Sequence, residues 1–98
     1  MRRAAKIDAN QRQIVAALRA VGASVRSLAA IGEGCPDLLV GYRSRNYLLE
    51  VKRDAKAKLT PEQELFFQSW RGPVYRVNSV DEALAVIGLV TTTDGRPA

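Results

Sequence analysis

Histidine is absent from the 98-residue sequence, and cysteine occurs once, as Cys35. The chain therefore lacks the usual general base, the usual zinc ligand and the group that normally activates a catalytic serine or cysteine. A single cysteine excludes an internal disulfide and a thiolate metal cluster, and it is consistent with a reducing compartment. These absences exclude the common hydrolytic triads and the common zinc sites.

Long apolar runs are also missing. No segment approaches the roughly 20 apolar residues that a membrane-spanning helix needs. Met1-Arg2-Arg3 is basic, but the apolar core of a signal peptide does not follow it. We therefore expect no membrane partner and a cytoplasmic protein, in a bacterium or in a phage-infected host cell.

Basic residues exceed acidic ones, and the formal net charge is +5. Eleven of the fifteen basic residues are arginine, whose planar guanidinium group matches phosphate with two hydrogen bonds. This bias suits a nucleic-acid partner. Proteins that never contact nucleic acid also show an excess of this size, so the charge alone does not decide the matter.

The segment 34–52 contains two short apolar runs, Leu38–Val40 and Tyr47–Leu49, of the length expected for buried strands. The polar residues 43–46 between them have the length of a hairpin connection. The segment therefore predicts two paired antiparallel strands.

Three charged residues interrupt this apolar hairpin. If its turn is centred between Arg43 and Ser44, residues whose numbers sum to 87 face each other, and Asp37 lies opposite Glu50. Because side chains alternate along a strand, Glu50 and Lys52 share one face. The three charges are then expected to converge on one spot.

Two carboxylates this close repel each other unless a cation lies between them. A hard divalent cation meets this need, and Mg²⁺ is typically held by one or two carboxylates together with substrate phosphate. Lys52 could then stabilise a phosphate or position a water. The alternative is a solvated surface ion pair between Glu50 and Lys52, which would contribute little.

The pattern Pro36-Asp37, followed after twelve residues by Glu50-Val51-Lys52, resembles the signature of the PD-(D/E)xK nuclease superfamily. The segment 34–38, GCPDL, is similar to the stand-alone VRR-NUC domains, and Gln63 fits the same pattern. The resemblance implies an α/β fold, a restriction-endonuclease-like αβββαβ core with a mixed β-sheet flanked by helices.

The same resemblance implies metal-dependent, structure-selective cleavage of DNA, at branched structures such as Holliday junctions or flaps. Asp37 and Glu50 would bind Mg²⁺ or Mn²⁺, helped by the main-chain carbonyl of Val51, and Lys52 would assist the attacking water. No organic cofactor is implied. In this family a Glu commonly projects from the first helix toward the metal, and here Gln13 stands in that region.

Helical spacing and caps predict the remaining elements. A helix is expected over 9–21 with Asp8 as its cap, and a strand over 23–28. A second helix begins after Thr60, a strand spans 74–77 parallel to the strand that bears Glu50, and a third helix follows Ser79. We expect a basic arm at 1–7, a nuclease-like domain at 8–88 and a disordered tail at 89–98.

The second helix places Gln63, Phe66, Phe67 and Trp70 on one stripe. This periodicity favours a buried aromatic core, and the alternative is a base-stacking platform. Gln63 then faces inward near the end of the Glu50 strand. Its capping role could explain it entirely, and a contact to substrate or water is also open.

Several basic residues are candidate contacts to the DNA backbone, with plain solvation as the alternative. They are Arg43, Arg45, Arg53, Lys56 and Lys58.

Four functions remain open. Two of them are a sequence-specific, restriction-type nuclease, against which the missing recognition segments count, and a subunit of a larger assembly. The other two are favoured by the residues. The first is a metal-dependent endonuclease acting on branched DNA, which as a homodimer would place two sites on two strands. The second is a DNA-binding module that keeps the nuclease scaffold but has lost turnover, for which the neutral Gln13 argues.

Overall fold

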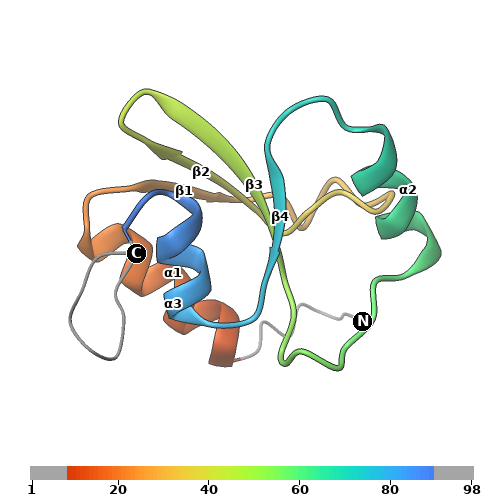
Figure 1. Cartoon of the computed structure of the whole chain (residues 1–98), viewed down its shortest axis with the longest axis horizontal. Coiled ribbons are helices and arrows are strands. Elements are labelled where there is room, and N and C mark those ends of the chain that lie inside the picture. Colours follow the sequence, from red (N-terminus) through yellow and green to blue (C-terminus); the bar gives the residue numbers. More distant parts are fainter. Residues whose placement is uncertain (1–8, 90–98) are drawn as a thin grey trace.

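A computed structural model describes residues 9–89, and the cap at Asp8, the predicted arm at 1–7 and the tail from 90 onward lie outside these residues. The elements are α1 (Ala9–Ala20), β1 (Ser24–Ser27), β2 (Leu38–Tyr42), β3 (Arg45–Val51), α2 (Pro61–Ser69), β4 (Val74–Val77) and α3 (Val80–Val86). The strands form one sheet in the order β1-β2-β3-β4 (Figure 1). The first three are antiparallel and β4 is parallel to β3. The predicted α/β class with a mixed sheet is confirmed.

The hairpin between β2 and β3 has the predicted register, because Leu38 pairs with Leu49 and Tyr42 with Arg45. Arg43 and Ser44 form a two-residue turn with φ values of 51° and 67°. Positive φ at both positions is what a tight hairpin of this twist requires. The connection is therefore shorter than the predicted residues 43–46.

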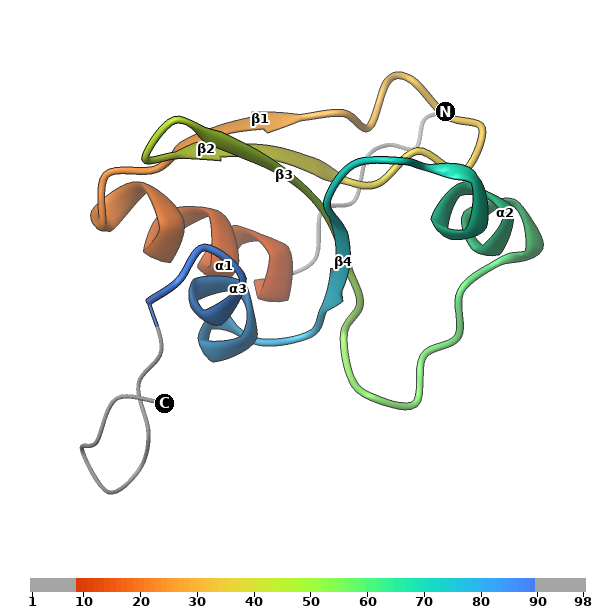
Figure 2. The same ribbon diagram turned by 45° about the horizontal axis from the view of Figure 1, so that its top comes forward.

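The hydrophobic core lies between one face of the sheet and the helices α1 and α3 (Figure 2). Ile14 and Leu18 of α1 and Ala83 of α3 pack there against alternate strand residues. The buried strand residues of this cluster are Val25, Leu38, Val40, Leu49, Val51 and Val77. Glu50 lies between two of them in β3, so its side chain points to the opposite face.

The second helix lies on that opposite side, away from α1 and α3 (Figures 1 and 2). Its predicted capping box is present, with the Thr60 hydroxyl accepting from the Gln63 main chain. The predicted aromatic core is wrong, since α2 has no buried residue and Trp70 is 49% exposed. Helical periodicity identifies an apolar stripe, but it does not say whether protein covers that stripe.

The C-terminal elements follow the sequence closely. Strand β4 spans the predicted residues 74–77, parallel to β3. Ser79 caps α3 by accepting from the Glu82 main chain, while the Glu82 carboxylate accepts from Asn78, one residue earlier than in a regular capping box. Leu89, which the sequence placed in the tail, packs against the core. Residues 9–89 contain no helix long and apolar enough to cross a membrane.

Candidate active site

Asp37 is held by main-chain contacts immediately before β2. Its carboxylate Oδ2 accepts a hydrogen bond from the Val51 main-chain N–H at 2.8 Å. Its main-chain carbonyl accepts from Leu28 at 2.8 Å, next to the end of β1. Extending the observed register by one residue places Asp37 opposite Glu50, as predicted. We call Asp37 and Glu50 the acidic pair.

Glu50 is the one charged residue that is buried among residues 9–89, with 2% of its surface exposed. Its Oε2 atom accepts from the Gln63 side-chain amide at 3.0 Å and lies 3.6 Å from the Lys52 ammonium. Its Oε1 atom is buried and has no hydrogen-bond donor when both acids are ionised, whereas a protonated Glu50 side chain forms a hydrogen bond with Asp37. Burying a carboxylate oxygen without a hydrogen-bond donor costs free energy. Such an oxygen is therefore expected to bind an ion or a water.

Burial is the main cause that raises the pKa of Glu50, from 4.5 to about 7. The neighbouring charge of Asp37 raises the pKa further, and Lys52 opposes the shift. One amine therefore does not compensate the acidic pair. A bound cation would offset both the cost of burying the ionised Glu50 side chain and its repulsion by Asp37.

Gln63 joins the helix to the acidic pair. Its side-chain Oε1 accepts from the Lys52 ammonium at 2.9 Å and from the Thr60 main chain at 2.9 Å, while its Nε2 donates to Glu50. The predicted capping role of Gln63 is confirmed, and the structure adds contacts to Glu50 and Lys52. A contact of Gln63 with substrate or water stays a prediction. The same side chain thus fixes the start of α2 and orients two charged groups.

Gly34 sets how closely the loop before β2 approaches α2. Its φ is 76°, in the region that favours glycine, and its α-carbon lies against the first turn of the helix. A β-carbon there would contact the Glu62 carbonyl oxygen and lie 2.6 Å from its carbon. Only glycine allows this approach, which holds the first turn of α2 beside the site.

The acidic pair fits a hard divalent cation. No group of three or more His, Cys, Asp or Glu side chains suited to a metal ion occurs within residues 9–89. Mg²⁺ needs fewer protein ligands, because it retains waters and binds substrate phosphate. The unpartnered Glu50 Oε1 is an oxygen of the kind that such an ion prefers.

Cys35 lies near this site without being a candidate nucleophile. Burial is the first cause that raises the pKa of its thiol, followed by the charges of Glu50 and Asp37. A thiol near two carboxylates stays protonated, and the thiolate is the reactive form.

Gln13 is exposed on α1, and the structure does not join it to the acidic pair. Asn10 is the α1 residue that reaches this end of the sheet. Its side-chain amide donates to the main-chain carbonyls of Lys52 at 2.8 Å and Asn78 at 3.2 Å. The sequence analysis missed Asn10, although it stands four residues before the buried Ile14 and so shares its stripe.

The predicted DNA contacts fall into two groups. Arg53, Lys56 and Lys58 are exposed in the loop that joins Lys52 to α2. Arg43 lies at the far end of the hairpin, and Arg45 is five residues from Glu50, roughly 17 Å along the strand. By alternation Arg45 shares the face of Leu49 and Val51, so it points to the side opposite Glu50.

Arg76 is a further basic residue that the sequence analysis did not single out. It pairs with Glu50 across β3 and β4, which places both side chains on the same face. Its guanidinium donates to the Asp54 main-chain carbonyl at 2.9 Å and so tethers the loop after Lys52. The predicted parallel pairing of β3 with β4 was the signal for Arg76, because it brings a residue of 74–77 opposite Glu50.

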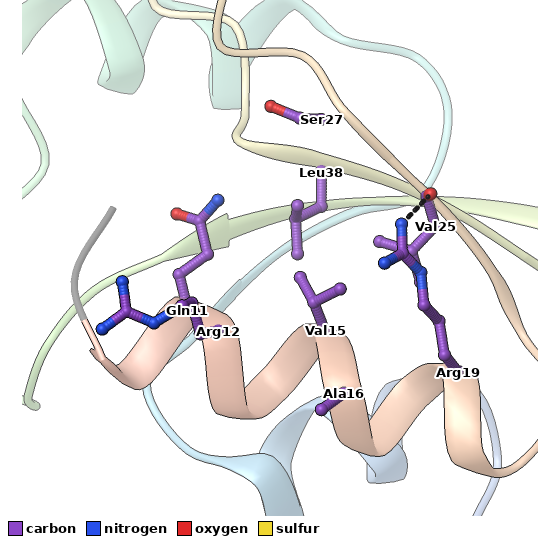
Figure 3. A pocket seen from close by; sticks show the side chains of 8 residues that line it. All are labelled: Gln11, Arg12, Val15, Ala16, Arg19, Val25, Ser27 and Leu38. Carbon is purple, nitrogen blue, oxygen red and sulfur yellow. Dashed lines mark hydrogen bonds between the residues drawn. The ribbon is translucent and has the colours of Figure 1, made fainter. Parts of the chain in front are cut away.

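A pocket of about 350 Å³ lies elsewhere, between α1 and the strands β1 and β2 (Figure 3). Its walls include Val15, Val25 and Leu38, and the Arg19 guanidinium donates to the Val25 carbonyl at 3.1 Å. Leu38 belongs to the core face of the sheet, so this pocket is separated from the acidic pair by the sheet itself.

The fold and the acidic pair together define the class of protein. A mixed sheet that presents an acid before one strand and Glu-x-Lys at the end of the next has the arrangement of a PD-(D/E)xK nuclease fold. A solved structure described as a "VRR_NUC domain" matches the chain with a TM-score of 0.67 and 32% sequence identity, over 79% of this chain and 88% of that one. The chain belongs to the VRR-NUC family. Comparisons with protein-family models and with curated proteins gave no match.

Proposed function

We propose that this protein is a Mg²⁺- or Mn²⁺-dependent endonuclease that hydrolyses phosphodiester bonds in branched DNA, at Holliday junctions or flaps. One observation supports this function above all others. Glu50 is buried next to Asp37 with one carboxylate oxygen unpartnered. Burying such a group is expensive unless a cation binds it or a proton neutralises it, and at neutral pH and above a cation is the more effective of the two. Family membership supports a nuclease-like fold and DNA as the partner.

Asp37 and Glu50 would hold the cation, together with the main-chain carbonyl of Val51. When bound, the cation would neutralise charge on the scissile phosphate and lower the pKa of an attacking water. The protein's contribution is to keep the two carboxylates together. The Val51 N–H holds one of them in place, and burial between sheet and helix holds the other.

Lys52 would stabilise negative charge on the phosphate as the bond to phosphorus breaks. Gln63 accepts a hydrogen bond from one of the three N–H groups of the Lys52 ammonium, which leaves donors for a phosphate oxygen or a water. Gln63 is thus proposed as a positioning residue for both Lys52 and Glu50. It is held in turn by the Thr60 main chain.

Branched DNA is proposed because a chain of this size offers little surface for reading base sequence. Arg53, Lys56 and Lys58 are exposed in the loop between Lys52 and α2 and would contact the phosphate backbone. A homodimer would present two such sites related by a two-fold axis, which suits a four-way junction. Sedimentation equilibrium of the purified protein tests the dimer directly.

The function is tested by incubating labelled duplex, flap and four-way-junction DNA with the protein in Mg²⁺, Mn²⁺ or EDTA. We expect cutting of the branched substrates with either metal and none in EDTA. Asp37→Asn should abolish cutting, whereas Asp81→Asn, an exposed acid on α3, should not change it. Binding without cutting by the wild-type protein in both metals would refute the enzyme and establish the DNA-binding module.

A further inference from the structure

Two large apolar side chains are exposed at helix α2, Leu65 within the helix and Trp70 at its C-terminal cap. Leu65 is 63% exposed and Trp70 is 49% exposed. Phe66 stacks on Trp70 with ring centroids 4.9 Å apart and an interplanar angle of 17°. Exposed apolar side chains gathered on one element usually mark a binding surface. This stacked aromatic pair is not used by the core or by the proposed metal site.

The aromatic pair lies close to the site along the helix. Gln63 in the first turn bonds Glu50 and Lys52. Phe66 and Trp70 follow it by three and seven residues, or about 4.5 Å and 10 Å of helix rise. Successive nucleotides of one strand are separated by about 3.4 Å along a helix axis. These rises equal about one to three nucleotide steps, so a base near the aromatic pair would belong to a nucleotide close to a phosphate at the acidic pair.

The charges around α2 suit a nucleic-acid strand. Exposed basic side chains flank the helix on both sides, and they are Arg53, Lys56, Lys58 and Arg71. The acids Glu62 and Glu64 belong to the first turn, the end of the helix that carries Gln63, so they lie nearer the acidic pair than Trp70 does. A strand that runs from the basic loop past these two acids would meet positive charge again at Arg71, the residue next to the Trp70 ring. Basic residues combined with stacking rings are how proteins bind single-stranded nucleic acid.

We propose that Trp70, supported by Phe66, stacks on an unpaired base next to the scissile phosphate. A base inside intact duplex is stacked on both of its faces, so it offers no free face to the indole ring. Trp70 then selects DNA in which a single-stranded segment adjoins the cleavage point, such as a flap or a fork. The inference depends on the proposed function for the position of the scissile phosphate.

Trp70 is the sole tryptophan of the chain, so intrinsic fluorescence reports on it alone. We would titrate the protein in EDTA, where no cleavage is required, with single-stranded DNA, a flap duplex and a blunt duplex. Stacking should quench the fluorescence with the first two and leave it unchanged with the blunt duplex. Equal quenching by blunt duplex would overturn the proposal. If the protein shows this quenching in EDTA but cuts no substrate in Mg²⁺ or Mn²⁺, the proposed enzyme is refuted and base stacking by Trp70 is retained.

Variants separate base stacking from apolar docking of a second copy of the chain. Trp70→Ala should weaken flap binding roughly five- to hundredfold, the effect of losing one stacked base, with blunt-duplex affinity unchanged. Trp70→Phe should restore most of it. Leu65→Ala removes a more exposed apolar group that has no ring and should have no effect on DNA binding. If instead Trp70→Ala and Leu65→Ala both dissociate a dimer and leave flap binding intact, the surface belongs to a second copy and the proposal is wrong.

Discussion

Replacing Glu50 with glutamine should stabilise the metal-free protein at alkaline pH. The substitution keeps the shape of the side chain and removes a buried charge. Because the pKa of Glu50 is raised from 4.5 to about 7 in the folded protein, its ionised form is disfavoured there relative to the unfolded chain. At about 1.4 kcal/mol for each pKa unit, the ionised carboxylate costs up to about 3 kcal/mol of folding free energy.

The sign of the pH dependence follows from proton binding. Below pH 4.5 Glu50 is protonated in both states and costs nothing. As the pH rises from 4.5 to about 7, the unfolded chain releases this proton while the folded chain keeps it, so stability falls. Above about 7 the loss is complete. The advantage of Glu50→Gln should therefore be near zero at pH 4 and about 1–3 kcal/mol at pH 8.

Urea denaturation in EDTA at pH 4 and pH 8 measures this difference. Glu64→Gln, which removes an exposed carboxylate from α2, is the matched control and should show no comparable gain. Adding Mg²⁺ at ten to a hundred times its dissociation constant should stabilise the wild-type protein by about 1.4–2.7 kcal/mol at pH 8 and leave Glu50→Gln unchanged. A variant that is less stable than wild type at pH 8, or equally favoured at both pH values, would refute the reasoning.

Three further substitutions test other parts of the site. Gly34→Ala should destabilise the protein by about 1–3 kcal/mol in urea denaturation and slow cleavage. Gly32→Ala is the control, because Gly32 also has a positive φ but has open space around it, and it should cost less stability and leave cleavage intact. Equal effects of the two variants would contradict the close approach of Gly34 to α2. Asn10→Ala removes hydrogen bonds to two main-chain carbonyls and should lower stability by about 1–2 kcal/mol in a thermal melt, and an unchanged melting temperature would show that these bonds are dispensable. Lys58→Ala should reduce the slope of log affinity against log salt by about one in DNA titrations, and an unchanged slope would remove Lys58 from the interface.

The hairpin and its register were predictable from the sequence because they follow from counting and from local chemistry. Two apolar runs around a polar turn leave few registers that bury both, and a slip of one residue would turn Leu38 and Leu49 outward. The proximity of Asp37 and Glu50 followed from that register. The capping box at Thr60 was predictable for the same reason, since its contacts span only three residues.

The position of α2 and the contacts of α1 were not predictable in this way. The stripe of Phe66 and Trp70 has the period of a buried helix, yet what lies opposite a stripe is set by tertiary packing. Gln13 was predicted as a site residue through the family resemblance. It precedes the buried Ile14 by one residue, so its side chain leaves α1 in a different direction and is exposed. Asn10 occupies the inward position, and its partners are carbonyls 42 and 68 residues away.

The attachment of α2 has a consequence for the order in which the protein opens. This helix contributes no buried side chain, so polar bonds through Gln63 and the close fit at Gly34 hold it to the sheet. Such an attachment is weaker than apolar burial, and segments of this kind unfold locally while the rest of the domain stays intact. Backbone amides of α2 should then exchange with solvent deuterium well before those of α1. Each opening would separate Gln63 from Glu50 and Lys52, so assembly of the site and closure of α2 are a single event.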